Sequence, residues 1–580
     1  MARPVSLARP VSLAYPATGV FMSDAPALVS QTAWATGQSF IYGATNLRVE
    51  DRRWKTREGW EELTPENVPA GWHATDTQGA IYHDPPGDIP PCIIESASGQ
   101  LWRITPSART FTVEDISSGR RGTADARLAW LASGDKYVLR TEHNAPTQIW
   151  DGTQTTFSQG YNPNQPDTSG LPNFAGPVTF TDRFWIAYNG REIIAGDFAH
   201  RTIATDTSDL IRTKDNAYDI TSISFPPPAP MGDVKALFTV TTTRGGGLPS
   251  QGEVIAATTN PNLWGILAGI PRAQWAETQM RRIVMERTCP TGPYAAISLS
   301  SELLFRSNDG FSTIKYADQE KSAPGNPMVN VGQEIKIILD NDHEPDLLYA
   351  SAVSAYGRQR FACTVAPEVR SAARWHRGYV SAALQPGRTR IPEALVWEGV
   401  SVLPERMGKI VQFILFGTRI FALTLKPNGT KGLAEWTTAP YDRLADGTCL
   451  PIRWQLLTRR LATDYWYTAG FSQLLLRLSA FRESISAEIH VRTDRDPQFR
   501  KIDARTWCND GWATAGGHGD TGTVIFRNLP AGEATWVQFL IKGVGACTVE
   551  LAVSEPSEQT PNEGKRPVAS GFDTCNFFDP

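Results

Sequence analysis

The strongest constraint in this sequence is the repetition of short apolar β-runs separated by turn residues. The runs FWIAY (184–188) and REIIAGD (191–197) flank Asn189 and Gly190. This pair can take the positive φ angles of a two-residue type I′ turn, so the stretch predicts a β-hairpin. The same alternation of strand and turn predicts antiparallel meanders of three or four strands each, at 92–115, 126–152, 295–317 and 411–439.

The spacing of these meanders indicates the architecture of residues 76–450. They recur at intervals of roughly 40 to 60 residues, near the length of one β-propeller blade. No Trp-Asp signature repeats at the blade ends, so an array of sandwiches remains the alternative. We expect a β-propeller-like domain, decorated by helical or irregular segments at 259–288 and 367–376.

The pattern changes after residue 450. Longer alternating runs at 473–480, 485–494, 521–529, 535–543 and 547–554 predict a β-sandwich over residues 451–555. The expected fold class is therefore all-β, with a β-propeller-like domain of antiparallel meanders followed by a C-terminal β-sandwich. Residues 1–75 would form an N-terminal arm and a β-hairpin platform, and residues 556–580 an extended C-terminal tail.

Composition excludes several classes of protein. The 56 basic and 60 acidic residues among 580 give a formal charge of −4, whereas a dedicated duplex-DNA binder carries a strong basic excess. The seven cysteines contain no CxxC pair, which argues against a zinc site and fits buried thiols in a reducing cytoplasm. No run approaches the ~18 apolar residues of a membrane span, so we expect no membrane partner.

The sequence lacks the common motifs for catalysis and cofactor binding, and its one metal candidate is weak. The sequence has no phosphate-binding loop of the G-x-x-x-x-G-K type, no H-E-x-x-H helix and no G-x-S-x-G elbow. We therefore expect no enzyme activity, no catalytic residue and no cofactor. The best metal candidate is DNDHEPD, in which oxygen ligands for calcium alternate at Asp340, Asp342, Glu344 and Asp346. It lacks the glycine and distal glutamate of a hand-type loop, so a solvated acidic turn is favoured and no metal site is assigned.

A second enzyme hypothesis comes from SNDGFSTI, residues 307–314. Ser307, Asp309 and Thr313 match the Asp box of sialidase propellers, whereas Phe311 and Ile314 depart from it. Asp boxes shape blade turns and do not catalyse. The Asn-Asp-Gly turn chemistry favours a hairpin inside a blade, which leaves a propeller glycosidase as a third-ranked function.

A cluster of arginine and tryptophan stands out in ATNLRVEDRRWKTREGW, residues 44–60. Its acids Glu50, Asp51 and Glu58 offset three of its five basic charges, which argues against a nucleic-acid grip. The alternation instead predicts a β-hairpin with its turn near 51–53, and arginine and aromatic residues are enriched at interfaces. We expect a subunit interface containing Arg48, Arg52, Arg53, Trp54, Arg57 and Trp60, together with Phe577 and Phe578 at the end of the tail.

Three stretches carry a resemblance to phage virion proteins. In the first, Asn46, Leu47, Val49, Trp54, Arg57 and Gly59 follow the spacing of an N-terminal segment common in such proteins, without its turn glycine. The second, residues 289–314, looks like one of their propeller blades, and the third, from RWQLLTRRL to HVRTDRDPQF, is similar to the sandwich that follows the propeller. The chain thus resembles the tail nozzle, or packaged-DNA stabilisation, proteins of short-tailed bacteriophages.

This resemblance implies a structural virion protein assembled in the bacterial cytoplasm and located in the phage tail. Such a protein forms a homo-oligomeric ring, with a hexamer favoured, below the portal and adaptor. It retains or conducts packaged DNA through the ring without sequence-specific binding. The alternative that we keep is a tail-tip or appendage protein that recognises a host-surface glycan.

Overall fold

A computed structural model describes residues 10–12, 28–29 and 41–554 with internal gaps. The gaps are 51–52, 88, 125, 144, 158–174, 189, 199–209, 211–224, 243–250, 269–280, 286, 300–301, 315–334, 341, 343, 356–359, 367–373, 385–394, 463–468, 471–472, 482–483, 508–519, 528–532 and 535. Phe577 and Phe578 therefore lie outside the described residues, as do Arg52 and most of the segment 367–376.

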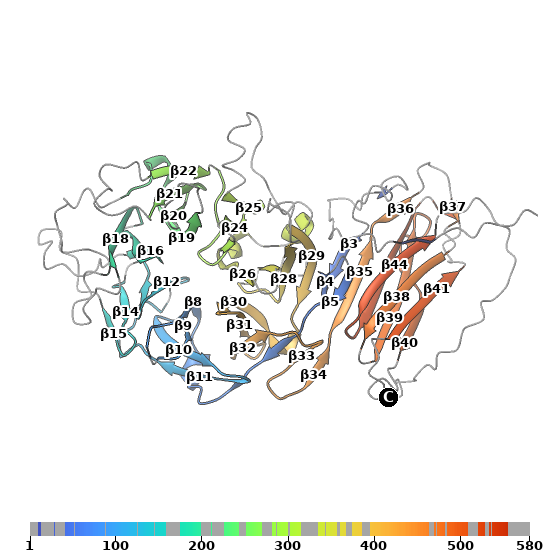
Figure 1. Ribbon diagram of the computed structural model, residues 1–580, viewed down its shortest axis with the longest axis horizontal. Coiled ribbons are helices and arrows are strands. Elements are labelled where there is room, and N and C mark those ends of the chain that lie inside the picture. The colour runs from blue at the N-terminus through green and yellow to red at the C-terminus, as the bar shows by residue number, and fades with distance from the viewer. Residues whose placement is uncertain are drawn as a thin grey trace, which may run out of the picture.

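Within the described residues, seven antiparallel sheets surround one axis and form a β-propeller (Figure 1). The first strand of each sheet contacts the first strand of the next sheet, and the last one contacts the first, which closes the circle. These inner strands are β8 (Thr77–His83), β12 (Trp130–Gly134), β16 (Ala175–Phe180), β19 (Val234–Thr242), β23 (Ala296–Leu299), β26 (Ala352–Ala355) and β30 (Lys409–Phe416).

The outer strands follow in chain order, and each predicted meander lies within one blade. Blade one adds β9 (Cys92–Ala97), β10 (Gln100–Pro106) and β11 (Thr110–Asp115), and blade two adds β13 (Tyr137–Thr141), β14 (Gln148–Trp150) and β15 (Thr155–Phe157). Blade three adds β17 (Arg183–Tyr188) and β18 (Glu192–Phe198), and blade four adds β20 (Gln251–Thr258), β21 (Leu263–Leu267) and β22 (Arg281–Met285). Blade five adds β24 (Glu302–Ser307) and β25 (Gly310–Thr313), and blade six adds β27 (Arg360–Val365), β28 (Gly378–Leu384) and β29 (Leu395–Val402).

Blade seven is completed by a strand from the N-terminal part of the chain. Its strands β30, β31 (Arg419–Leu425) and β32 (Lys431–Trp436) come from consecutive sequence, but the fourth strand is β6 (Trp60–Glu62). Strand β6 pairs antiparallel with β32, with Trp60 opposite Trp436. The hairpin β33 (Tyr441–Arg443) and β34 (Cys449–Pro451) continues this sheet, and β7 (Thr64–Pro65) pairs with β11 of blade one. The propeller is thus closed by residues from both ends of its sequence.

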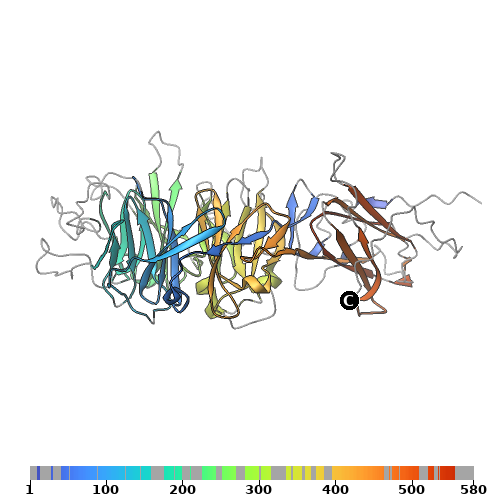
Figure 2. The same cartoon turned by 90° about the horizontal axis from the view of Figure 1, so that it is seen from below.

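The C-terminal strands form the predicted sandwich beside the propeller (Figure 2). One sheet contains β4 (Leu47–Glu50), β5 (Arg53–Thr56), β44 (Thr548–Ser554), β38 (Gln473–Phe481) and β41 (Asp520–Arg527), with β1 (Pro10–Ser12) paired to β44. The other contains β3 (Ile41–Thr45), β35 (Arg453–Thr458), β43 (Trp536–Val544), β39 (Ile485–Thr493) and β40 (Arg500–Trp507), with β36 (Arg460–Ala462) and β2 (Leu28–Val29). A separate pair joins β37 (Ala469–Gly470) to β42 (Glu533–Ala534).

Alternating burial explains why these sequences form sandwich strands. Along β39 the apolar residues Ile485, Ala487, Ile489 and Val491 are buried, and the residues between them are half-buried. This period of two matches the pleat of a strand that covers a core on one face. The described helices are short: α2 (Ala70–His73), α4 (Lys336–Leu339), η5 (Ala229–Met231), η8 (Glu344–Tyr349) and η10 (Glu405–Met407).

Three sequence expectations need correction. Within the segment 259–288, residues 263–267 and 281–285 are not helical or irregular but form β21 and β22 of blade four, and residues 269–280 and 286 lie outside the described part of the chain. Its apolar run LWGIL is buried along both faces, a pattern that cannot separate helix from strand, and pairing with β20 decides the outcome. Residues 41–62 are not a separate platform, since β3 to β5 belong to the sandwich and β6 belongs to the propeller. The two-residue turn expected at positions 189 and 190 is wrong, because Tyr188 pairs with Glu192 and three residues therefore separate the paired strands.

Candidate functional site

The predicted arginine–tryptophan cluster forms the junction between the two domains. Strands β4 and β5 make the expected hairpin, with Val49 opposite Trp54 and Glu50 opposite Arg53. Trp54 is buried in a core that includes residues of the sandwich and of blade six, such as Phe539 and Phe361. The hairpin therefore packs inside one continuous core shared by both domains.

Arg57 is buried at this junction and bridges the two domains. It donates from Nη1 and Nη2 to the two carboxylate oxygens of Asp442, at 2.8 and 2.7 Å, and each side chain is 3% exposed. Its Nε donates to Asn46, and its Nη2 also donates to the carbonyl of Val402 in blade six. Burial by itself lowers the pKa of Arg57, but the Asp442 carboxylate outweighs it and raises the pKa, so the guanidinium stays charged.

A second buried ion pair holds the same hairpin from blade six. Glu398 on β29 accepts a hydrogen bond from the backbone N–H of Val49, and Arg360 on β27 donates to the carbonyl of Val49. Arg360 and Glu398 lie 3.3 Å apart and are 8% and 1% exposed. Strand β3 also pairs with β29 at Thr45 and Val400. These contacts fix the sandwich against the propeller.

The tryptophan that follows the hairpin is the centre of blade seven. Trp60 is fully buried, stacks on Trp436 at 5.5 Å between ring centroids, and donates from Nε1 to the Tyr379 hydroxyl. Its backbone N–H donates to Asp442, the same carboxylate that binds Arg57. One aspartate therefore holds both the junction and the closing strand.

These positions correct the interface assignment for three of the predicted residues. Trp54, Arg57 and Trp60 are buried within the chain, so they offer no surface to a neighbouring subunit. The reason is the long-range pairing of β5 and β6, which brings partners from hundreds of residues away. Arg48 forms ion pairs with Glu50 and Glu58, at 2.6 and 2.5 Å.

Arg53 is the described member of the predicted interface that stays exposed, at the start of β5. Arg52, Phe577 and Phe578 lie outside the described residues, and their interface assignment stays a prediction.

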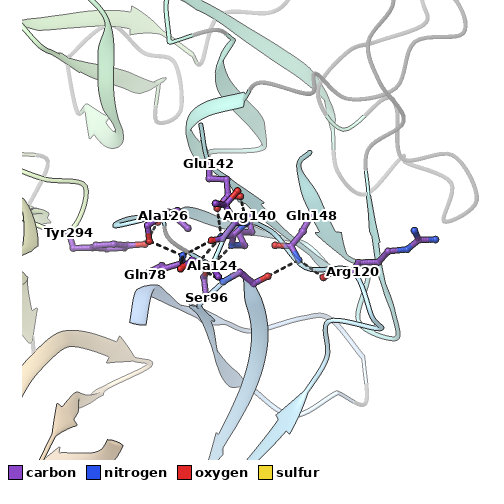
Figure 3. A network of polar contacts seen from close by, with 12 residues as sticks. Gln78, Ser96, Arg120, Ala124, Ala126, Arg140, Glu142, Gln148 and Tyr294 are labelled. Carbon is purple, nitrogen blue, oxygen red and sulfur yellow. Dashed lines mark hydrogen bonds and ion pairs between the residues drawn. The ribbon is translucent and has the colours of Figure 1, made fainter. Parts of the chain in front are cut away.

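Side chains from opposite blades meet at the axis of the propeller. Tyr294, which precedes β23 of blade five, donates to the carbonyl of Ala129, which precedes β12 of blade two. A Cβ added at Gly79 of blade one would lie 2.0 Å from the Tyr294 hydroxyl, so glycine is needed there for the close approach. Burial raises the pKa of Tyr294, which keeps its hydroxyl protonated as a donor. Figure 3 shows this ring extending toward the polar network of blades one and two.

An arginine crosses the same region. Arg374 donates from Nη2 to the carbonyls of Thr77 and Arg127, in blade one and before blade two. Its guanidinium lies 4.6 Å from the ring of Tyr349 and 4.5 Å from the ring of Trp375. Together with Tyr294, these side chains fill the axis with protein at this level.

A buried polar network joins blade one to blade two (Figure 3). Arg140 and Glu142 are both fully buried and paired at 2.5 Å, and Arg140 also donates to Ser96 and Gln78. Gln78 and Glu142 in turn bind the backbone of Thr123 in the connecting segment. The hydrogen bonds from Arg140 to Ser96 and Gln78 cross from blade two to blade one, so this network helps to pack the seam.

The predicted calcium candidate has a structural role at one of its positions. The side chain of Asp342 is 2% exposed, lies 3.3 Å from Arg306 and accepts a hydrogen bond from the backbone of Ala366. Asp340 is exposed, and the side chain of Glu344 lies outside the described part of the chain. Among the residues whose side chains are described, no three His, Cys, Asp or Glu residues gather as a metal site requires.

Cysteine chemistry also points away from nucleophilic catalysis at the described buried thiols. Burial raises the pKa of Cys92, Cys363 and Cys547 to about 12, so these thiols stay protonated and unreactive at neutral pH. Cys449 is exposed, which differs from the expectation of buried thiols. The segment 307–314 forms the expected hairpin between β24 and β25.

A groove that sequence reasoning missed opens between blades six and seven. It encloses about 540 Å³, and among the described residues its lining includes the cations Arg377, Lys409 and Lys426 and the carboxylate of Glu405. The residues before β28 meet blade seven here, since the backbone of His376 pairs with Ile410. No local motif marks this site, because its charges lie up to 49 residues apart and are gathered only by blade packing.

Comparisons with known proteins match only the arrangement of strands. No protein-family model matches the chain, and no curated protein matches it. The C-terminal WD40 domain of Sif2 is similar at 9% identity and a TM-score of 0.33, over 66% of this chain and 99% of that domain. Sqt1 of Saccharomyces cerevisiae is similar at 9% identity and a TM-score of 0.35, over 69% of this chain and 96% of that protein. BamB of Moraxella catarrhalis is similar at 10% identity and a TM-score of 0.28, over 68% of this chain and 96% of that protein. The fold class rests on the chain's own strand pairing, which is that of an all-β propeller and sandwich.

None of the described helices is both long and apolar enough to cross a membrane.

Proposed function

We propose that this chain is a structural, non-enzymatic component of a short-tailed phage tail, which assembles into a homo-oligomeric ring that retains or conducts packaged DNA. The observation that carries the proposal is the position of residues 44–60. This stretch bears much of the resemblance to phage virion proteins, and it is also the segment that ties the sandwich to the propeller through Arg57 and Asp442.

A ring component needs a fixed arrangement of its domains, and the junction between the sandwich and the propeller is rigidly held. Two buried ion pairs, a shared core and the pairing of β3 with β29 leave the domains no flexible linker between them. Buried pairs of this kind hold one geometry, because separating them would leave a buried charge without its partner.

The filled axis also bears on where DNA would pass. Tyr294 and Arg374 occupy the centre of the propeller, so a single chain offers no duct for a duplex at that level. In this proposal the duct lies between copies, at the centre of the ring. The net charge of −4 suits a wall that must release DNA.

The proposal is tested by electron microscopy of the purified protein and by mass spectrometry of purified virions. We expect rings of one fixed symmetry, and the chain in virions together with portal and adaptor proteins. A protein that stays monomeric and is absent from virions would rule the proposal out.

A further inference from the structure

The groove between blades six and seven combines positive charge with apolar surface. Lys409 is exposed at the start of β30, and Arg377 is half-buried just before β28. Lys426 lies 2.5 Å from Glu62, so part of its charge is already balanced. The groove therefore offers a modest positive field, with Lys409 as its most accessible cation.

The apolar part of the lining lies beside these cations. Trp375 forms one wall, and Leu425 and Pro427 belong to the end of β31 and the turn after it. Trp375 is already held by contacts with Tyr349 and Arg374, so its ring is fixed before any partner arrives. A groove with a fixed aromatic wall and neighbouring cations suits a partner that carries aromatic rings and carboxylates.

The chain itself contains such a segment. Residues 571–580, GFDTCNFFDP, contain Phe572, Phe577 and Phe578 together with Asp573 and Asp579, and no basic residue. Its carboxylates complement the cations of the groove, and its phenylalanine rings can pack on an aromatic and aliphatic wall.

We propose that the groove binds the segment 571–580 of a second copy of this chain. The segment begins at Gly571, 17 positions after the sandwich strand β44 ends at Ser554, and a chain of that length spans at most about 60 Å. A tethered segment within reach of an adjacent copy acts at high effective concentration. This inference rests on the proposed assembly and deepens it, because it names the surface through which one copy holds the next.

Fluorescence polarisation tests the contact with a labelled peptide of residues 568–580. The receptor is the full-length chain with Phe577→Ser and Phe578→Ser, so that its own tail does not compete. We expect saturable binding that weakens about tenfold or more with Lys409→Glu in the receptor, or with Asp573→Asn and Asp579→Asn in the peptide. The matched control is Arg406→Glu, an exposed arginine paired with Asp446 outside the groove lining, which should leave the affinity within about twofold.

A photo-crosslinking residue at position 577 of the otherwise unchanged full-length chain then identifies the copy that receives the segment. A product of two chains supports the inference, whereas a product within one chain overturns it. Equal binding of a scrambled peptide, or no effect of Lys409→Glu, would also overturn it. A chain that binds the peptide and crosslinks through position 577 to a second copy, but forms no ring, rules out only the proposed function. A ring-forming chain that does not bind the peptide rules out only this inference.

Discussion

Arg57 and Asp442 lie 385 positions apart in the sequence and share two hydrogen bonds, at 2.8 and 2.7 Å, where the sandwich meets the propeller. The same carboxylate accepts a hydrogen bond from the backbone of Trp60 in the closing strand β6. One side-chain pair therefore serves two structural tasks, the orientation of the domains and the closure of blade seven.

Removal of one partner of this pair should destabilise the whole chain. Arg57→Ala leaves the Asp442 carboxylate buried without its cation, which costs about 3–5 kcal/mol in comparable buried pairs. Urea unfolding should show a lower midpoint for both domains together, because they share a core. The control Arg406→Ala breaks the exposed pair with Asp446 and should cost about 0–1 kcal/mol. Equal midpoints for the two variants would contradict this role.

Trp60 should stabilise the folded monomer, so its loss should lower stability whether or not the chain assembles. Trp60→Ala empties the stack with Trp436 and Phe413, and such truncations cost about 3–5 kcal/mol. Thermal unfolding followed by circular dichroism should show a clear loss of Tm. Leu415→Ala, at a leucine that is 40% exposed, is the control and should change stability by less than about 0.5 kcal/mol. A Tm for Trp60→Ala close to that of the control would refute the closing role of β6.

The strands were predictable from sequence because their signals are local. Alternating burial along β39 and the turn at Asn308 and Asp309 come from neighbouring residues, so period and turn chemistry identify them. The hairpin of residues 47–56 follows the same rule, and its register pairs Val49 with Trp54.

The roles of the cluster residues were not predictable, because their partners are distant in sequence. Nothing local distinguishes Arg57, which binds Asp442, from Arg53, which stays exposed four positions earlier. The groove at Lys409 has the same origin, since blade packing alone brings it beside Arg377 and Trp375. Charge and aromatic content located an important segment, but only the fold separates a buried bridge from a surface.

The close approach at the propeller axis gives a further test. Gly79→Ala places a Cβ 2.0 Å from the Tyr294 hydroxyl, and overpacking of this kind costs about 1–3 kcal/mol. Tyr294→Ala removes the obstructing ring, so the double variant should be more stable than the sum of the two single losses predicts. Urea midpoints of the four proteins give the coupling, expected at about 0.5–3 kcal/mol. Strictly additive losses would show that the two residues do not meet.

His83 should make stability depend on pH. Burial lowers the pKa of His83 from 6.5 to about 4, so the folded chain resists a proton that the unfolded chain accepts. The stability is present above pH 6.5 and is lost as pH falls from 6.5 towards 4, by up to about 3 kcal/mol. His83→Gln keeps a polar group near Ser133 and should flatten this decline in urea unfolding at pH 7, 5.5 and 4.5. Part of the decline should remain, because burial also lowers the pKa of His376. An identical decline in both proteins would exclude His83 as a cause.

The proposed ring is tested most directly by mass photometry of the purified full-length chain. We expect one dominant species at a fixed multiple of 63.7 kDa, with about 380 kDa for the hexamer that the phage resemblance favours. That species should persist on dilution, since an assembly that must hold DNA needs tight subunit contacts. A single peak at 63.7 kDa at every concentration and salt condition would show that the chain forms no ring.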